Sequence, residues 1–316
     1  MEAKPRVAVV LVTWNAGADL ARCLQHLRAN TDWPYTLVVV DNGSTDGTRE
    51  AVSRLTHHGD APVRVLLPET NTGWVGGVNL AIRACPAELY FLLNPDAFVQ
   101  PGWLSPLVQT LQADPSLGFA SPKFRYLDGS VHYAGAYVSP GYSVRVHGHA
   151  EADDGRFDSP ARVPFAHGMS LVRRSVIDAV GALDPEFGLG YFEEVDLQLR
   201  ARRKGFGVAY VPASVIVHAT SAAFDQHPGG LKETLLTRNW LRVMALHWPW
   251  RWALARLPLE LVRPLRAALG GHSPLPSLRA LVQFARSLPE VRQARHRAAR
   301  SGNLAHRELE GPPRAR

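Results

Sequence analysis

A carboxylate at the end of an apolar run is the first place in this sequence where chemistry could occur. The apolar residues Tyr90–Leu93 lead directly into Asn94-Pro95-Asp96. Such a run predicts a buried strand, and α/β proteins bind ligands beyond the carboxyl ends of their strands. Asp96 could instead be a solvated turn residue, since Asn, Pro and Asp are common in turns. Its position at a strand end favours a ligand for a divalent cation.

A second acidic group follows two glycines farther along the chain. Glu193, Glu194 and Asp196 come after Gly188 and Gly190 and open a helical pattern. Acids at a helix start often only complement the helix dipole. Three acids so close together exceed what capping requires, so this segment is predicted to supply a base that takes a proton from a hydroxyl group.

Polar and small residues follow three of the predicted strands. Thr13 and Asn15 end the first apolar run, and Asp41 ends the second. A loop that enters a helix then supplies Asn71, Gly73, Gly77 and Asn79. A glycine-rich loop lets backbone amides approach a phosphate or a ribose, although such a loop is weak evidence when taken alone.

The elements that must position these residues alternate in type. Strands are predicted at 7–12, 36–40, 63–67 and 89–93, and helices at 18–27, 48–55, 75–84 and 103–111. This alternation predicts a parallel sheet covered by helices on both faces.

The pattern changes near residue 113, where mixed structure with hairpins is expected. Short strand-like runs at 119–121, 123–127 and 131–134 are separated by Pro122 and Asp128-Gly129. A long loop around 148–164, a helix from Glu193 and a final strand pair at 207–211 and 215–217 complete this half.

Charge is distributed unevenly. The net charge is +7, but residues 231–316 alone carry 16 Lys/Arg against 5 Asp/Glu. Tryptophans lie among these cations, and apolar residues recur there at helical spacing, from Leu278 to Leu288; the tryptophans are Trp240, Trp248, Trp250 and Trp252. Basic helices with tryptophans suit an anionic membrane surface. The other interpretation is a first helix packed on the preceding domain, followed by a solvated basic extension.

Other classes of protein are disfavoured. The stretch 205–224 is uncharged but contains Pro212, His218 and several hydroxyl residues, so it is not expected to span a membrane. The two cysteines, Cys23 and Cys85, have no disulfide or zinc spacing and are typical of reduced, packed thiols in the cytosol. No nucleic-acid-binding motif accompanies the basic charge, so no nucleic-acid partner is expected.

Short motifs in this chain, taken together, resemble those of the family 2 glycosyltransferases, and within them a rhamnosyltransferase-like bacterial branch. In chain order they are Val-Thr13-Trp-Asn15, Asp41-Asn-Gly-Ser-Thr-Asp46, Asn71-Thr-Gly73, Asn94-Pro-Asp96, Phe192-Glu193-Glu194-Val-Asp196, His218 and Thr237-Arg238-Asn239. The resemblance covers about residues 5–245. It implies an α/β GT-A fold, Rossmann-like, with a mixed sheet and helices on both faces, followed here by a helical C-terminal extension.

The resemblance also implies an activity. The enzyme would be an inverting glycosyltransferase with Mg²⁺ or Mn²⁺ as cofactor. Its donor would be a nucleoside diphosphate sugar, dTDP-rhamnose or a UDP-sugar. Its acceptor would be a hydroxyl of a polysaccharide or of a polyprenyl-linked glycan. We therefore expect a cytoplasmic protein, with peripheral attachment to the inner face of the cell membrane as the hypothesis for its basic tail.

Roles for individual residues follow from the resemblance. Asp96 and His218 are implied to hold the metal, whereas a single histidine after an apolar strand is by itself more often structural. Glu194 is implied to be the base, beside Glu193 and with Asp196 as the alternate. Thr13 and Asp41 would bind the nucleotide base, and the remaining donor-site residues are Asn15, Asn71, Gly73, Gly77, Asn79 and Asn94. Asn94 stands where the family motif has its first aspartate, which leaves more of the ion's coordination to the donor's pyrophosphate.

These observations predict a catalytic domain at 1–228, divided into a nucleotide-sugar-binding half (1–112) and an acceptor-binding half (113–228). A basic helical extension would follow at 229–316, with disorder toward its end. Two alternatives remain. A nucleotidyltransferase would carry a basic phosphate-activating loop, which the segment from Thr13 to Gly17 lacks. A non-catalytic sugar-nucleotide-binding scaffold would fit the altered metal motif, and donor binding without turnover would favour it.

Overall fold

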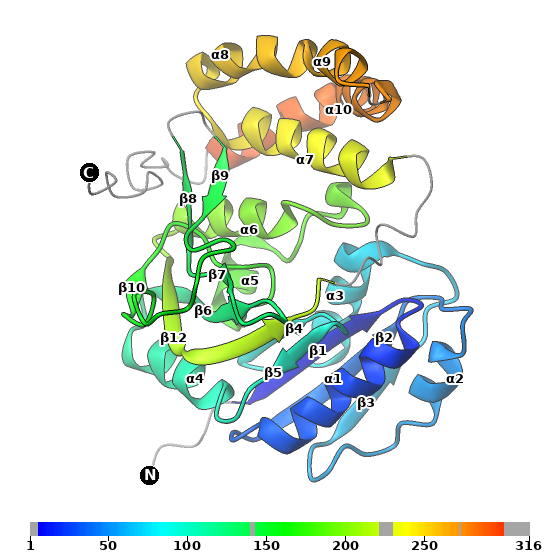
Figure 1. Ribbon diagram of the computed structural model, residues 1–316, viewed down its shortest axis with the longest axis vertical. Coiled ribbons are helices and arrows are strands. Elements are labelled where there is room, and N and C mark those ends of the chain that lie inside the picture. The colour runs from blue at the N-terminus through cyan, green and yellow to red at the C-terminus, as the bar shows by residue number, and fades with distance from the viewer. Residues whose placement is uncertain (1–5, 140–142, 221–229, 272, 300–316) are drawn as a thin grey trace.

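The computed structural model describes residues 6–139, 143–220, 230–271 and 273–299 (Figure 1). The strands are β1 (Val7–Thr13), β2 (Tyr35–Asp41), β3 (Val63–Leu66), β4 (Leu89–Leu93), β5 (Ala97–Val99), β6 (Leu117–Arg125), β7 (Val131–Tyr133), β8 (Ala136–Val138), β9 (Val144–Val146), β10 (Ala161–Arg162), β11 (Leu171–Arg173) and β12 (Gly207–His218). The helices are α1 (Gly17–Asn30), α2 (Thr48–Ser53), α3 (Gly73–Ala84), α4 (Leu104–Ala113), α5 (Arg174–Val180), α6 (Glu193–Arg202), α7 (Leu231–His247), α8 (Trp250–Leu261), α9 (Arg263–Leu269) and α10 (Leu275–Ala299), with a 3-10 turn η1 (Pro185–Phe187).

One large mixed sheet organises the chain. Its order is β10-β12-β6-β11-β4-β1-β2-β3, with β5 paired to β12 and β7 paired to β6. The first four strands run parallel, whereas β11 enters antiparallel between β4 and β6. Every residue of β1 is buried, as expected for a central strand covered on both faces. The predicted α/β fold with a mixed sheet is confirmed.

Two expectations about the middle of the chain were wrong. The runs separated by Pro122 form the single strand β6, and the expected final pair forms the single strand β12. The two strands are parallel neighbours, and their register jumps from Val211↔Pro122 to Val215↔Lys123. Proline cannot donate a ladder hydrogen bond, so the irregularity in β12 lies where β6 lacks that donor.

The helices α7 to α10 form a layer at one end of the molecule, beyond α6 (Figure 1). The first of them, α7, is part of the main core, because Trp240, Leu241, Val243 and Met244 belong to the same buried cluster as the sheet. The hydrophobic core therefore continues past the expected domain boundary at residue 228. Within the described ranges, no helix combines the length and apolar composition that a bilayer crossing requires.

The three tryptophans of this layer whose side chains are described do not form an exposed surface. Trp240 and Trp248 are buried, and Trp252 is half-buried against the core. The side chain of Trp250, and the expected disorder at 300–316, lie outside the described residues.

Candidate active site

Thr13 and Asp41 lie side by side at the ends of β1 and β2, where the parallel register pairs them directly. Both are buried. Asp41 Oδ2 accepts hydrogen bonds from Arg49 Nη1 at 3.1 Å and from the Ser44 amide at 3.3 Å. Within the described part of the chain, Asp41 Oδ1 and Thr13 Oγ1 have no hydrogen-bond partner. Buried polar atoms normally have a hydrogen-bond partner, so the polar groups of a bound ligand would satisfy these two oxygens.

Arg49 was missed by the sequence analysis. It follows Asp41 by eight residues and lies on α2, where its guanidinium also bonds to the carbonyls of Leu67 and Pro68. Nothing in the sequence around Arg49 indicates that its side chain contacts Asp41.

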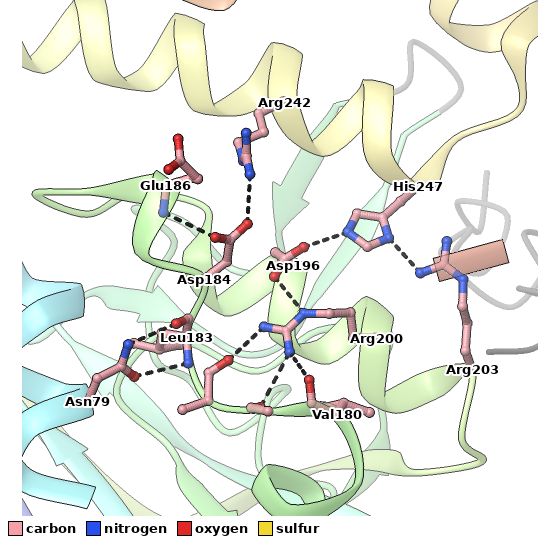
Figure 2. Close-up of polar contacts among 12 residues, drawn as sticks. Asn79, Val180, Leu183, Asp184, Glu186, Asp196, Arg200, Arg203, Arg242 and His247 are labelled. Atoms are coloured by element: carbon pink, nitrogen blue, oxygen red, sulfur yellow. Dashed lines mark hydrogen bonds and ion pairs between the residues drawn. The ribbon is translucent and has the colours of Figure 1, made fainter. Parts of the chain in front are cut away.

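Several predicted donor residues have hydrogen bonds within the protein. Asn15 accepts from the Thr45 amide at 2.8 Å, and Asn71 Oδ1 accepts from Asn42 Nδ2 at 2.9 Å. Asn79 is buried and exchanges hydrogen bonds with the amide and the carbonyl of Leu183, at 3.1 and 2.8 Å (Figure 2). Asn79 thus anchors the segment after α5 to α3.

The two predicted glycines allow close packing. A Cβ at Gly77 would lie 2.7 Å from a methyl carbon of Val12, so this glycine lets α3 approach β1. Gly73 has φ +73°, and a Cβ there would lie 2.6 Å from the carbonyl oxygen of Gly188. The nucleotide-side loop therefore touches the loop that leads into the acidic helix start.

Asp96 and His218 meet because β5 pairs with β12. Ala97 is the register partner of His218, and the Ala219 amide donates to the carbonyl of Asp96 at 2.9 Å. This places Asp96 Oδ1 3.3 Å from His218 Nε2. Neighbouring ligands of one ion, each at about 2.1 Å, lie about 3 Å apart, so the pair fits a divalent cation. Asn94 follows β4, and its backbone N–H donates to the sulfur of Met169 at 3.4 Å.

Glu193 and Glu194 begin α6 after a strained turn. Tyr191 and Phe192 both have positive φ, at 73° and 67°, which is uncommon for residues with side chains. Burial raises the pKa of Glu194 to about 6. Burial and then the charge of Glu194 raise the pKa of Glu193 well above its ordinary value. Two adjacent carboxyl groups with separated pKa values are typical of acid–base chemistry.

The strained turn is held by α7. Asn239 Nδ2 donates to the carbonyls of Gly190 at 2.7 Å, Tyr191 at 2.9 Å and Phe187 at 3.2 Å. Beside it, Arg238 Nη2 donates to the carbonyl of Glu186 at 2.8 Å. Arg238 and Asn239 of the Thr237-Arg238-Asn239 motif therefore hold the loop that precedes Glu194.

Asp196, the alternate base, forms ion pairs with Arg200 and His247. Its two oxygens accept from Arg200 Nε at 2.8 Å and His247 Nε2 at 2.7 Å, and Arg203 lies beyond the histidine (Figure 2). Burial alone would raise the pKa of Asp196, but Arg200 and His247 outweigh it and hold this pKa well below its ordinary value. A carboxylate so stabilised is a poor proton acceptor, and the geometry favours Glu194.

The Asp196 network borders a hollow of about 640 Å³ between the α5–η1 segment, α6, α7 and α10. Its lining includes Asp184, which accepts from Arg242 Nη2 at 2.9 Å (Figure 2). It does not include Thr13, Asp41, Asp96, Glu194 or His218. The candidate site is therefore separate from this hollow.

Two further histidines next to His218 were missed by the sequence analysis. His132 in β7 and His167 in the loop before β11 each offer a nitrogen within 4.8 Å of the others in the trio. Burial, then His218 and His149, lower the pKa of His132 to about 3. Burial, then His132 and His218, lower the pKa of His167 well below its ordinary value. No spacing in the sequence links these residues, which come from two strands and a loop.

Comparison with known proteins agrees with this architecture. The profile of Glycosyl transferase family 2 matches residues 8–181. The N-acetylglucosaminyl-diphospho-decaprenol L-rhamnosyltransferase of Mycobacterium tuberculosis is 29% identical over 245 residues, which cover 70% of this chain and 78% of that protein. An uncharacterized Sinorhizobium fredii protein is 28% identical over 233 residues, which cover 71% of this chain but only 25% of that protein.

Solved structures share the fold. The crystal structure of GalNAc-T7 with UDP, GalNAc and Mn²⁺ superposes with a TM-score of 0.63 at 18% identity, over 78% of this chain and 49% of that one. A mannosyltransferase from Pyrobaculum calidifontis in complex with GDP-Man and Mn²⁺ gives 0.55 at 19% identity, over 95% of this chain and 85% of that one. The fold is of the GT-A type, and the chain belongs to glycosyltransferase family 2.

Proposed function

We propose that this protein is an inverting glycosyltransferase that moves a sugar from a nucleoside diphosphate sugar to a hydroxyl group of a lipid-linked glycan. The observation that carries the proposal is the meeting of Asp96 and His218 at 3.3 Å, at the sheet end that also holds Asn94. A divalent cation held by this pair would meet the need of a sugar-nucleotide donor for positive charge at its diphosphate.

Each group has a distinct task in this proposal. Thr13 Oγ1 and Asp41 Oδ1, which have no other partner among the described residues, bind the polar edge of the donor's base. Asp96 and His218 would hold Mg²⁺ or Mn²⁺. Such an ion would stabilise the negative charge that develops on the departing diphosphate.

Glu194 takes the proton of the acceptor hydroxyl. The oxygen then attacks the anomeric carbon from the face opposite the diphosphate, the bond from that carbon to the diphosphate breaks, and the sugar inverts. Burial raises the pKa of the adjacent Glu193 well above its ordinary value, so this carboxyl group holds its proton more tightly than an exposed one. Positioning and electrostatic stabilisation should supply most of the rate.

The donor and acceptor classes rest on relatives. The Mycobacterium tuberculosis protein is named for rhamnose transfer to a diphospho-decaprenol-linked sugar, and this supports dTDP-rhamnose and a polyprenyl-linked acceptor. The solved structures contain UDP or GDP-mannose, so UDP- and GDP-sugars belong in the same test.

The test is release of nucleoside diphosphate from a panel of UDP-, dTDP- and GDP-sugars, with Mn²⁺ or Mg²⁺ and a polyprenyl-diphosphate-linked acceptor. We expect metal-dependent release from one donor, with loss of release in Asp96→Ala. The product's anomeric configuration, read by NMR, should be opposite to that of the donor.

Glu186→Gln is the matched control, because Glu186 is an exposed carboxylate in the segment that precedes α6. It should keep full activity. Donor binding without turnover would instead support a scaffold, and a full-rate Asp96→Ala variant would remove the metal role.

We also propose that the α8–α9 region docks on an anionic membrane. Exposed apolar side chains lie along these two helices: Leu257, Leu259, Leu261, Val262, Leu265 and Leu269. Arg251 in α8 and Arg266 in α9 are also exposed. This apolar-basic surface, which we call the α8–α9 surface, combines the two features that favour binding to anionic lipid. Such docking would bring a polyprenyl-linked acceptor to the enzyme.

A further inference from the structure

Three histidine rings from separate parts of the chain lie close together. One of them, His218, also belongs to the candidate metal pair with Asp96. His132 comes from β7, His167 from the loop before β11, and His218 from the end of β12. Their ring centroids are 5.1 Å apart for His132 and His218, 5.5 Å for His132 and His167, and 5.9 Å for His167 and His218. One nitrogen from each lies within 4.8 Å of the other two.

These distances suit a metal ion. Nitrogens bound to Zn²⁺ at about 2.0 Å in a tetrahedral site lie about 3.3 Å from one another. His132 Nδ1 and His218 Nδ1 are 3.4 Å apart. His167 Nδ1 accepts a hydrogen bond from the Met169 amide at 3.1 Å, and an ion that takes this nitrogen would displace that bond.

The rings are held by the surrounding structure. The β6–β7 register jumps between Tyr133 and Val131, so His132 occupies the irregular position. Bulges of this kind often re-aim a side chain. The amide of His167 donates to Ser121 Oγ at 3.1 Å, and Gln198 of α6 exchanges hydrogen bonds with the amide and the carbonyl of Ala166. The ring of Phe124 lies against His167, with centroids 4.1 Å apart.

We propose that His132, His167 and His218 form a binding site for a metal ion that is intermediate between hard and soft, such as Zn²⁺ or Co²⁺. Imidazole nitrogens prefer these ions, whereas Mg²⁺ prefers oxygen ligands. Three histidines leave one coordination position open to water or to an oxygen of a bound ligand.

His218 connects this site to the proposed donor metal. Its Nδ1 faces His132, and its Nε2 faces Asp96 Oδ1 at 3.3 Å. A neutral imidazole has one lone pair, so His218 serves one ion at a time. When Nδ1 binds the transition metal, Nε2–H donates to Asp96, the common carboxylate–histidine–metal arrangement. The two ions therefore compete for His218; this consequence, unlike the site itself, rests on the proposed function.

The test is metal binding to the full chain without donor. Calorimetric titration with Zn²⁺ and Mg²⁺, and the visible absorption of added Co²⁺, report affinity and imidazole ligation directly. We expect Zn²⁺ to bind more tightly than Mg²⁺ by orders of magnitude. His132→Gln and His167→Gln should each weaken Zn²⁺ binding by more than about tenfold and weaken the Co²⁺ bands.

His149→Gln is the matched control. His149 is exposed, contacts Tyr126 through its Nδ1 at 3.1 Å, and lies near His132 without belonging to the trio. It should bind Zn²⁺ like the unsubstituted chain. Circular dichroism and thermal melting confirm that each variant is folded.

Unchanged Zn²⁺ affinity in folded His132→Gln or His167→Gln would overturn the proposal. So would loss of Zn²⁺ binding in Asp96→Asn together with full binding in His167→Gln, because the ion would then lie between Asp96 and His218. None of these measurements uses a sugar donor, so their failure is distinct from failure of the proposed transfer activity.

Discussion

At the scale of single residues, the acidic pair at the start of α6 separates two carboxyl groups by environment. Burial raises the pKa of Glu194 to about 6, and the pKa of Glu193 lies well above its ordinary value. At neutral pH Glu194 is then mostly ionised and able to take a proton, while Glu193 holds its proton more tightly than an exposed carboxyl group does. Two neighbouring groups of one residue type thus differ in pKa.

This separation predicts a pH dependence. The base must be ionised, so transfer activity should rise with pH, reach half its maximum near the Glu194 pKa of about 6, and level off above it. Glu194→Gln should lower the rate by about 10²–10⁴-fold and remove this acidic limb. The measurement is kcat/KM between pH 5 and pH 8.5 for the two proteins at saturating metal. A Glu194→Gln variant with full activity would assign the base elsewhere.

At the scale of elements, α7 acts on the site through the α6 loop. The Asn239 amide satisfies three carbonyls of the loop that contains the left-handed Tyr191 and Phe192. Without that amide the carbonyls lose their partner, and the strained turn loses a restraint on the position of Glu194.

We therefore expect Asn239→Leu to lower the free energy of unfolding by about 1–3 kcal/mol. It should also reduce kcat at temperatures where the variant is fully folded. Chemical denaturation and steady-state rates measure the two effects. Gln283→Ala removes an exposed amide from α10 and is the control. If Asn239→Leu matches this control in both assays, the loop does not depend on α7.

At the scale of the whole molecule, the helical layer at one end carries the α8–α9 surface, with exposed leucines such as Leu265 and Leu269. A leucine side chain that leaves water contributes about 1.5–3 kcal/mol. A double Leu265→Glu, Leu269→Glu variant should therefore bind anionic liposomes at least about tenfold more weakly at low salt.

Flotation of liposomes measures this binding. Leu127→Glu is the control, because Leu127 is an exposed leucine just after β6, outside the helical layer. High salt should weaken the binding of the unsubstituted chain, since arginines contribute to it. Binding that is equal in the double variant and the control would exclude the α8–α9 surface as the docking site.

The sequence by itself determined the strand ends and the family. Strands β1, β2 and β4 lie within one or two residues of their predicted limits, because continuous apolar runs and their polar ends are local properties. The candidate residues Thr13, Asp41, Asp96 and Glu194 follow from those ends and from the motifs around them. The parallel register that pairs Thr13 with Asp41 is also expected from neighbouring parallel strands.

Tertiary structure decided which side chains have free polar groups and which do not. Nothing in the sequence separates Asn79 and Asp196 from the other candidate residues. In the structure, Asn79 bonds to the backbone of Leu183, and the Asp196 carboxylate bonds to Arg200 and His247. Packing of the helices also buries Trp240 and Trp248, while leucines of α8 and α9 remain exposed. The histidine trio depends on the pairing of β7 and β12 with β6 and on the loop before β11. Contacts between residues far apart in the chain depend on strand register and helix packing, and no local periodicity encodes either.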